Sequence, residues 1–157
     1  MSQKGEHRNR GASPQRAVMS RRSARERAIS ILYEARIKEI SPSDVLATEG
    51  EGVADALTAR IVSGVSSMQA QLDARIAEHS ITWGFERLPI TAVCILEAAI
   101  WELIDGQVSA AVVIDEAVEL AKTFGEPAAA RFVNGVLSRI AGELGRLARR
   151  PESSAGE

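Results

Sequence analysis

The 157-residue sequence has few of the side chains that form covalent or metal-dependent sites. Cys94 is the only cysteine, which excludes an intramolecular disulfide and a cysteine-based zinc site. The two histidines, His7 and His79, lie far apart, and neither has a second ligand at helical spacing. The sequence also lacks a glycine-rich phosphate loop, a nucleophile elbow and any plausible catalytic set of side chains. We therefore expect a protein that is not an enzyme and that uses neither a metal nor a cofactor.

Long hydrophobic runs and strand patterns are missing as well. The longest apolar stretch, residues 88–101, is interrupted by Glu97 and is too short to span a bilayer. The basic N-terminal segment lacks the apolar stretch that follows such a segment in a signal peptide. No segment alternates strictly between apolar and polar residues between hairpin turns. These absences predict a cytoplasmic protein without a membrane partner and with an all-α fold.

The charges that are present are distributed unevenly along the chain. Residues 1–27 contain eight basic and two acidic side chains, a net charge of +6, whereas residues 28–157 carry −8. Residues 1–19 have almost no apolar side chains and are expected to form a disordered basic arm. A helical domain is expected over residues 20–148, followed by a disordered tail over 149–157. A basic segment in front of an acidic body favours a polyanionic partner such as nucleic acid.

Apolar residues recur at steps of three and four along most of the domain, the pattern of amphipathic helices. Capping residues or prolines mark the predicted helix starts at Ser20, Ser41, Pro89, Ser109 and Pro127. Between Val53 and Ile76 the pattern predicts two helices that are broken or kinked around Ser66 and Ser67. The sequence thus predicts about seven helices, of which the one that begins at Pro89 is apolar almost all round and should be buried.

A faint internal repeat indicates two related halves. Residues 28–32 parallel 92–96, and residues 60–65 parallel 131–136, in the same order. Chance similarity between amphipathic helices is the alternative explanation. Each half would place a glycine inside a helix, Gly64 and Gly135, which costs about 0.5 to 1 kcal/mol relative to alanine. We expect both glycines to mark a close approach of helix backbones.

The first helix carries the candidate binding residues. Arg21, Arg22 and Arg25 occupy neighbouring positions on its first turns. Guanidinium groups there can bind phosphates, and the N-terminus of the helix also favours anions. A solvated charged face is the alternative, but the uneven charge distribution favours RNA or DNA. Tyr33, two turns beyond Arg25, is expected either to stack on an unpaired base or to be a half-buried core residue.

Two C-terminal segments are specific enough to indicate a family. They are residues 113–125, VIDEAVELAKTFG, and residues 132–137, FVNGVL. Together with the arginines that precede Ala28 and the sequence Trp101-Glu102-Leu103, they resemble the NusB family of transcription antitermination factors over about residues 20–145. The resemblance implies two helical bundles packed side by side, in agreement with the internal repeat.

The resemblance also implies a function. A protein of this family pairs with the ribosomal protein NusE and binds a short single-stranded boxA element of nascent ribosomal RNA. The transcribing RNA polymerase complex, with other Nus factors, then reads through terminators. The residues that match RNA-binding positions of the family are Arg21, Arg22, Arg25, Tyr33, Lys122 and Phe132. The alternative functions are a helical adaptor or homodimer that binds protein, and an accessory module of a ribosomal RNA methyltransferase. For Phe132, the alternative role is packing in the core.

The sequence departs from the family pattern at two places. Ala92, Val93 and Glu97 stand where the family usually has an acidic–basic pair and, one turn later, an arginine. Residues 127–130, Pro-Ala-Ala-Ala, lack the polar side chains that are common before the phenylalanine. The resemblance places both departures near surfaces for the protein partner and the RNA. We therefore expect an altered affinity for one or both.

Overall fold

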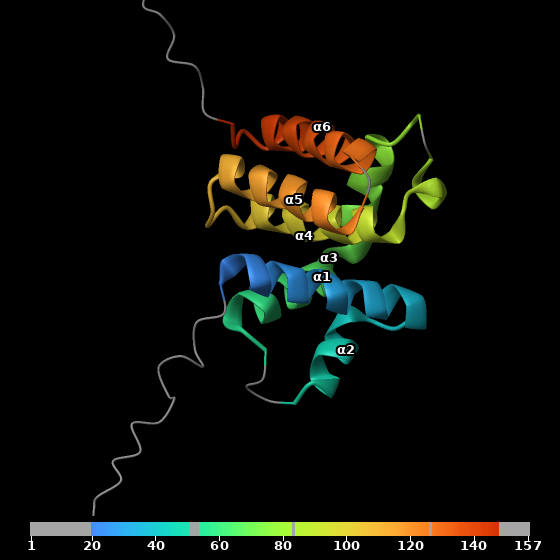
Figure 1. Cartoon of the computed structure of the whole chain (residues 1–157), viewed down its shortest axis with the longest axis vertical. Helices are drawn as coiled ribbons and strands as arrows, with labels where there is room; N and C mark the ends of the chain where they lie inside the picture. Colours follow the sequence, from blue (N-terminus) through green and yellow to red (C-terminus); the bar gives the residue numbers. More distant parts are fainter. Residues whose placement is uncertain (1–19, 51–53, 83, 126, 148–157) are drawn as a thin grey trace, which may run out of the picture.

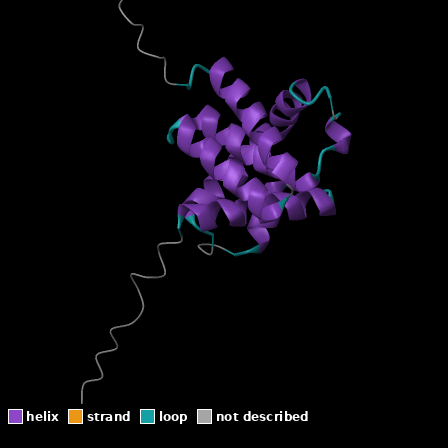
Figure 2. Cartoon of the chain, turned by 45° about the horizontal axis from the view of Figure 1, so that its top comes forward, coloured by secondary structure: helices purple, strands orange, loops and turns teal. Residues whose placement is uncertain are grey.

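The computed structural model describes residues 20–50, 54–82, 84–125 and 127–147, and all regular structure in these ranges is helical (Figure 2). The elements are α1 (Arg21–Lys38), α2 (Pro42–Thr48), α3 (Ala56–Glu78), the short 3-10 helix η2 (Phe85–Arg87), α4 (Ile90–Asp105), α5 (Ala110–Phe124) and α6 (Pro127–Glu143). The prediction of an all-α fold is confirmed. The expected arm, residues 1–19, and the expected tail, residues 149–157, lie outside the described residues.

Side-chain caps determine where several helices begin. The Ser20 hydroxyl accepts a hydrogen bond from the Ser23 amide at 3.1 Å, and Ser41 accepts one from Asp44 at 3.1 Å. These bonds satisfy amides that have no partner within the helix. At the other end of the domain, Ser109 caps α5 and Pro127 is the first residue of α6. The helix starts predicted from serine and proline are confirmed.

The predicted break around Ser66 and Ser67 is wrong, because α3 is one continuous helix. The Ser67 hydroxyl donates a hydrogen bond to the Gly64 carbonyl at 2.9 Å, one turn earlier in the same helix. The Ser66 hydroxyl accepts a bond from the Ser43 amide of α2 at 3.3 Å. Both serines therefore find partners without interrupting the helix. The described ranges consequently contain six α-helices and η2, where about seven helices were expected.

The helices form two bundles, and α4 lies at the junction between them (Figure 1). In the first bundle α1, α2 and α3 pack on one another, and in the second α4, α5 and α6 do so. Because α4 also packs against α1 and α3, nearly its whole circumference is buried, as its apolar sequence predicted. Within the described ranges, no helix combines the length and the apolar character needed to cross a membrane.

The two helix glycines differ in their surroundings. A Cβ added at Gly64 would lie 1.9 Å from Nε1 of Trp101, so the indole rests directly on the backbone of α3. A close contact with another helix is therefore present at Gly64, but the group that approaches is a side chain and not the expected helix backbone. A Cβ at Gly135 would meet no atom within 4 Å, and the residue is exposed. The expectation of a close approach at Gly135 is wrong.

Candidate nucleic-acid interface

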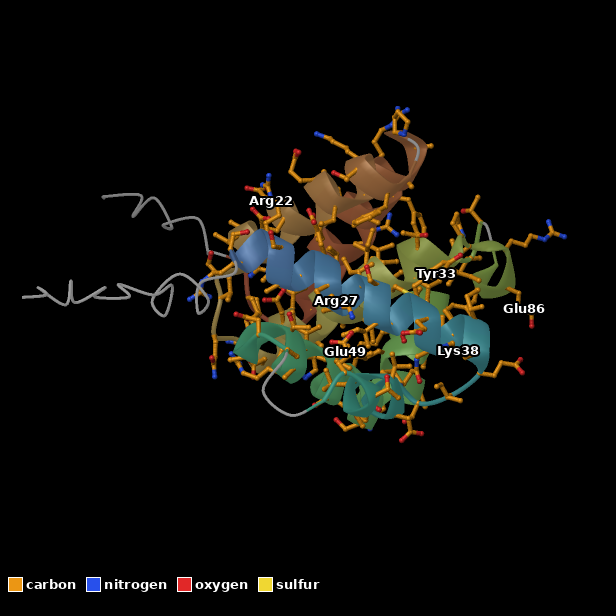
Figure 3. All side chains as sticks on the ribbon, turned by 60° about the horizontal axis from the view of Figure 1, so that its bottom comes forward. Arg22, Arg27, Tyr33, Lys38, Glu49 and Glu86 are labelled. Atoms are coloured by element: carbon orange, nitrogen blue, oxygen red, sulfur yellow. The ribbon has the colours of Figure 1, made fainter. Side chains whose placement is uncertain are left out.

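One edge of α1 presents polar and aromatic side chains to the solvent. Arg22 and Tyr33 are eleven residues apart, which is three helical turns, so they lie on the same edge about 16 Å apart along the helix axis. Figure 3 shows both side chains on the side of α1 that faces the second bundle. Arg21 is exposed at the start of the helix, and Tyr33 is 43% exposed. Arg22 and Tyr33, together with Arg21 at the start of the helix, are called the α1 edge below, although Arg21 points about 100° away from Arg22 around the helix.

Arg22 is oriented by a carboxylate of the second bundle. Its Nε and one Nη donate to the two carboxylate oxygens of Glu116 on α5, at 3.0 and 3.1 Å. This hydrogen bonding raises the pKa of Arg22 and lowers that of Glu116. Because a guanidinium has five N–H groups and these bonds use two, three remain for another acceptor. The arginine is thus held in place while it stays accessible.

Arg25 does not share this exposed edge, contrary to the expectation from its spacing. The side chain is 4% exposed, and its guanidinium donates to both oxygens of Glu102 on α4 at 2.9 and 3.0 Å. Arg25 lies between Arg21 and Arg22 around the helix, about 40° from the first and about 60° from the second, and this direction faces α4 at the junction between the bundles. In this position Arg25 fixes α1 against α4.

Two further basic side chains of α1 lie on a different edge. Arg27 forms an ion pair with Glu49, next to α2, and Lys38 pairs with Glu34 at 2.7 Å. In Figure 3, Arg27 and Glu49 lie on the side of α1 opposite the second bundle. Carboxylates pair with basic residues on both edges, and the α1 edge differs in presenting the exposed ring of Tyr33 beside its arginines.

Lys122 and Phe132 lie at the corner of α5 and α6, on two different hollows. Lys122 is exposed, lies 3.2 Å from Glu119 and lines a shallow groove with Arg131 and Asn134. Phe132 is half-buried in an apolar hollow of about 370 Å³ where the start of α4 meets the end of α5 and the start of α6. Arg131 was missed by the sequence reasoning, and its place directly before Phe132 is the signal that could have found it.

A second charged cluster is enclosed between the bundles. Arg36 of α1 donates to both oxygens of Asp73 on α3 at 2.9 Å, and to Glu97 of α4 at 3.0 Å. Gln69 of α3 adds a bond to Glu97 at 3.1 Å, and Phe85 lies 5.9 Å from the guanidinium. The pKa of Glu97 is raised to about 7, and burial of the carboxyl is the largest cause. The charge of Asp73 adds to this increase, whereas the guanidinium of Arg36 opposes it. Burial alone would lower the pKa of Arg36, but the two carboxylates raise it.

This cluster changes the interpretation of the departures from the family pattern on α4. Glu97 is fully buried, and Ala92 and Val93 are each 4% exposed. Glu97 and Val93 therefore face the interior, whereas Ala92 lines the apolar hollow beside Phe132, where an effect on partner or RNA affinity stays a prediction. The alanines of residues 127–130 do border the two hollows at the corner of α5 and α6.

The fold and the α1 edge together define a two-bundle helical domain with an exposed cationic and aromatic surface on its first helix. The family model described as "NusB family" matches residues 22–142, and the chain belongs to this family. The transcription antitermination protein NusB of Bacillus velezensis is 41% identical over 125 residues, 78% of this chain and 95% of that protein. The protein of the same name from Bacillus subtilis is 34% identical over 128 residues, 80% of this chain and 98% of its own length. The solved structure of T. maritima NusB superposes with a TM-score of 0.71 at 27% identity, covering 80% of this chain and 92% of the other.

Proposed function

We propose that this protein is a non-enzymatic, RNA-binding transcription antitermination factor. Together with the ribosomal protein NusE it binds boxA-type RNA of nascent ribosomal RNA, and the pair keeps the transcribing RNA polymerase complex processive. Membership of the NusB family and relatives named transcription antitermination proteins support the general role. The observation that carries RNA binding is the α1 edge, where Arg22 precedes the exposed Tyr33 on one side of the helix and Arg21 is exposed at the helix start.

The α1 edge binds RNA through two kinds of contact in this proposal. Arg21 and Arg22 hold phosphates, since guanidinium groups bind phosphate oxygens in a bidentate manner. Tyr33 receives an unpaired base on its ring, a contact that tolerates any base because each has a π-face. Arg25 takes no phosphate, because Glu102 occupies it. Its part is to hold α1 in the orientation that aligns the other three residues.

The corner of α5 and α6 supplies a second contact area. Lys122 and Arg131 add positive charge to the groove there, and the half-buried ring of Phe132 offers an apolar surface beside the neighbouring hollow. A single strand that crosses from the α1 edge to this corner meets basic side chains and an aromatic ring at each of the two places. The acidic remainder of the chain, at −8 for residues 28–157, favours a basic protein partner such as a ribosomal protein.

A titration of fluorescent boxA-type RNA tests this function, with and without the NusE protein and beside a scrambled RNA. For about five phosphate contacts to a single strand, we expect log affinity to fall with log salt at a slope near −3.5. Arg22→Gln together with Tyr33→Leu should weaken binding and leave the helical content unchanged. A complex that is insensitive to salt contradicts the proposal, and equal affinity for both RNAs reduces it to non-specific binding of polyanions.

A further inference from the structure

A polar hollow of about 150 Å³ lies where the start of α1 meets the start of α3 and the end of α4. Two arginines line it, Arg21 of α1 and Arg60 of α3, together with the indole of Trp101 from α4. We propose that this hollow binds one nucleotide of single-stranded RNA, with the phosphate on the two arginines and the base against Trp101. The proposal rests on the proposed function, because Arg21 also begins the α1 edge.

The carboxylates beside the hollow already have partners. Glu102 gives both oxygens to the buried guanidinium of Arg25 at 2.9 and 3.0 Å. Asp105 accepts one hydrogen bond from Arg60 at 2.7 Å, which leaves four N–H groups on that guanidinium. Within residues 20–50, 54–82, 84–125 and 127–147, no ion pair joins Arg21 to a carboxylate. The hollow therefore keeps positive charge and unused donors for an anion.

The aromatic wall of the hollow is fixed before any ligand binds. Trp101 rests on the backbone of α3, because Gly64 has no side chain to displace it. The guanidinium of Arg60 lies 5.7 Å from the centre of the indole ring, within the range of a cation–π contact. Because the cation and the ring are already in place, a ligand loses little free energy to the ordering of these side chains when it binds.

The remaining lining favours a nucleotide over a small inorganic anion. Leu57 and Val108 add apolar surface, and Gln107 adds an amide that can both donate and accept. A phosphate ion would use only the arginines. A nucleotide uses the arginines for its phosphate, the apolar wall for the face of its base, and the amide for a polar edge of that base.

Charge variants test the assignment in a titration with labelled single-stranded RNA of about 12 nucleotides. Arg60→Gln should weaken binding about ten-fold and make the salt slope shallower by about 0.7, the value for one lost phosphate contact. Arg139→Gln is the matched control, since it removes the same charge from an exposed site on α6. We expect that variant to change the affinity less than two-fold. Asp105→Asn should bind at least as tightly as the unaltered protein, because it removes a negative charge next to the phosphate.

Tryptophan fluorescence gives a second, direct measurement. In a Trp83→Phe variant Trp101 is the only tryptophan. We expect RNA to quench its emission with the same midpoint as the anisotropy titration, and Arg60→Gln to shift that midpoint.

Three outcomes would overturn the assignment. If Arg22→Gln weakens RNA binding while Arg60→Gln behaves like Arg139→Gln, the hollow binds no nucleotide and the proposed function stands. If Asp105→Asn weakens binding as much as Arg60→Gln does, Arg60 acts only through its ion pair, and the assignment fails. If the unaltered protein binds no RNA, the proposed function and the nucleotide site fall together.

Discussion

The three arginines at the start of α1 have three different environments. Arg21 borders the hollow beside Trp101, Arg22 shares two hydrogen bonds with Glu116, and Arg25 is enclosed against Glu102. A guanidinium in contact with water keeps most of its hydration, whereas a buried one depends on its partner. Residues that look equivalent in the sequence therefore have separate tasks, two at the surface and one in the interior.

Substitution at Arg25 should unfold the protein more readily than substitution at its neighbours. Arg25→Ala leaves the Glu102 carboxylate buried without a partner, and we expect a loss of about 3 to 5 kcal/mol in the free energy of unfolding. Arg21→Ala with Arg22→Ala should leave the midpoint of urea unfolding nearly unchanged. In the double variant Arg25→Met with Glu102→Leu, most of the stability should return. If Arg25→Ala is as stable as the unaltered protein, the buried pair has no structural importance.

The two helix glycines allow a matched comparison. Gly64→Ala places a methyl group on the Trp101 indole and should destabilise the fold by about 1 to 3 kcal/mol, the usual cost of overpacking. Gly135→Ala meets no neighbour and should stabilise α6 by about 0.5 to 1 kcal/mol, because alanine favours the helix. Chemical denaturation of the two variants measures both effects. Opposite signs are expected, and equal signs would contradict the observed contacts.

At the scale of elements, charged groups determine how α1, α3 and α4 are arranged. Glu97 of α4 is fully buried, and the structure places Arg36 of α1 beside it. Two carboxylates, Asp73 and Glu97, share this single guanidinium. The enclosed cluster would carry a negative charge if both were ionised, so holding a proton on Glu97 is favourable near neutral pH.

This cluster predicts a pH dependence of stability. The pKa of Glu97 is raised to about 7 in the folded protein from an ordinary value of 4.5. Its contribution is therefore complete below about pH 4.5 and is lost as the pH rises through about 7, with a slope of at most about 1.4 kcal/mol per pH unit. Glu97→Gln should remove this slope, because glutamine does not titrate. Urea unfolding of both proteins across this range measures the difference, and identical slopes would show that Glu97 holds no proton.

The sequence predicted helix boundaries better than it predicted contacts between helices. Ser41, Ser109 and Pro127 mark helix starts because capping is a local interaction between a residue and the next turn. The Ser66 hydroxyl inside α3 accepts its hydrogen bond from the amide of Ser43 in another helix. The burial of Arg25 depends in the same way on a carboxylate 77 residues away. No local pattern reports such a partner.

For the molecule as a whole, we expect the basic segment to contribute to RNA affinity and the helical domain to determine the stability of the fold. Removal of residues 1–19 takes away Lys4, Arg8, Arg10 and Arg16 but keeps Ser20, which caps α1. We expect a lower affinity for RNA, with a salt slope shallower by about 0.7 for each lost phosphate contact, and an unchanged unfolding temperature. An adaptor that binds only protein would keep its partner affinity after this deletion. Titrations of the truncated and full-length chains with RNA and with NusE distinguish the two functions.

The position of α4 has a consequence for how the domain fluctuates. Because four other helices cover it, its amide hydrogens reach water only when both bundles come apart. α2, a seven-residue helix whose main contacts are with α1 and α3, can open at much lower cost. We therefore expect local opening at α2, on the periphery of the first bundle. Arg25 and Arg36 bind carboxylates of α4, the helix whose amide hydrogens should exchange most slowly. The α1 edge should therefore keep its shape while α2 opens.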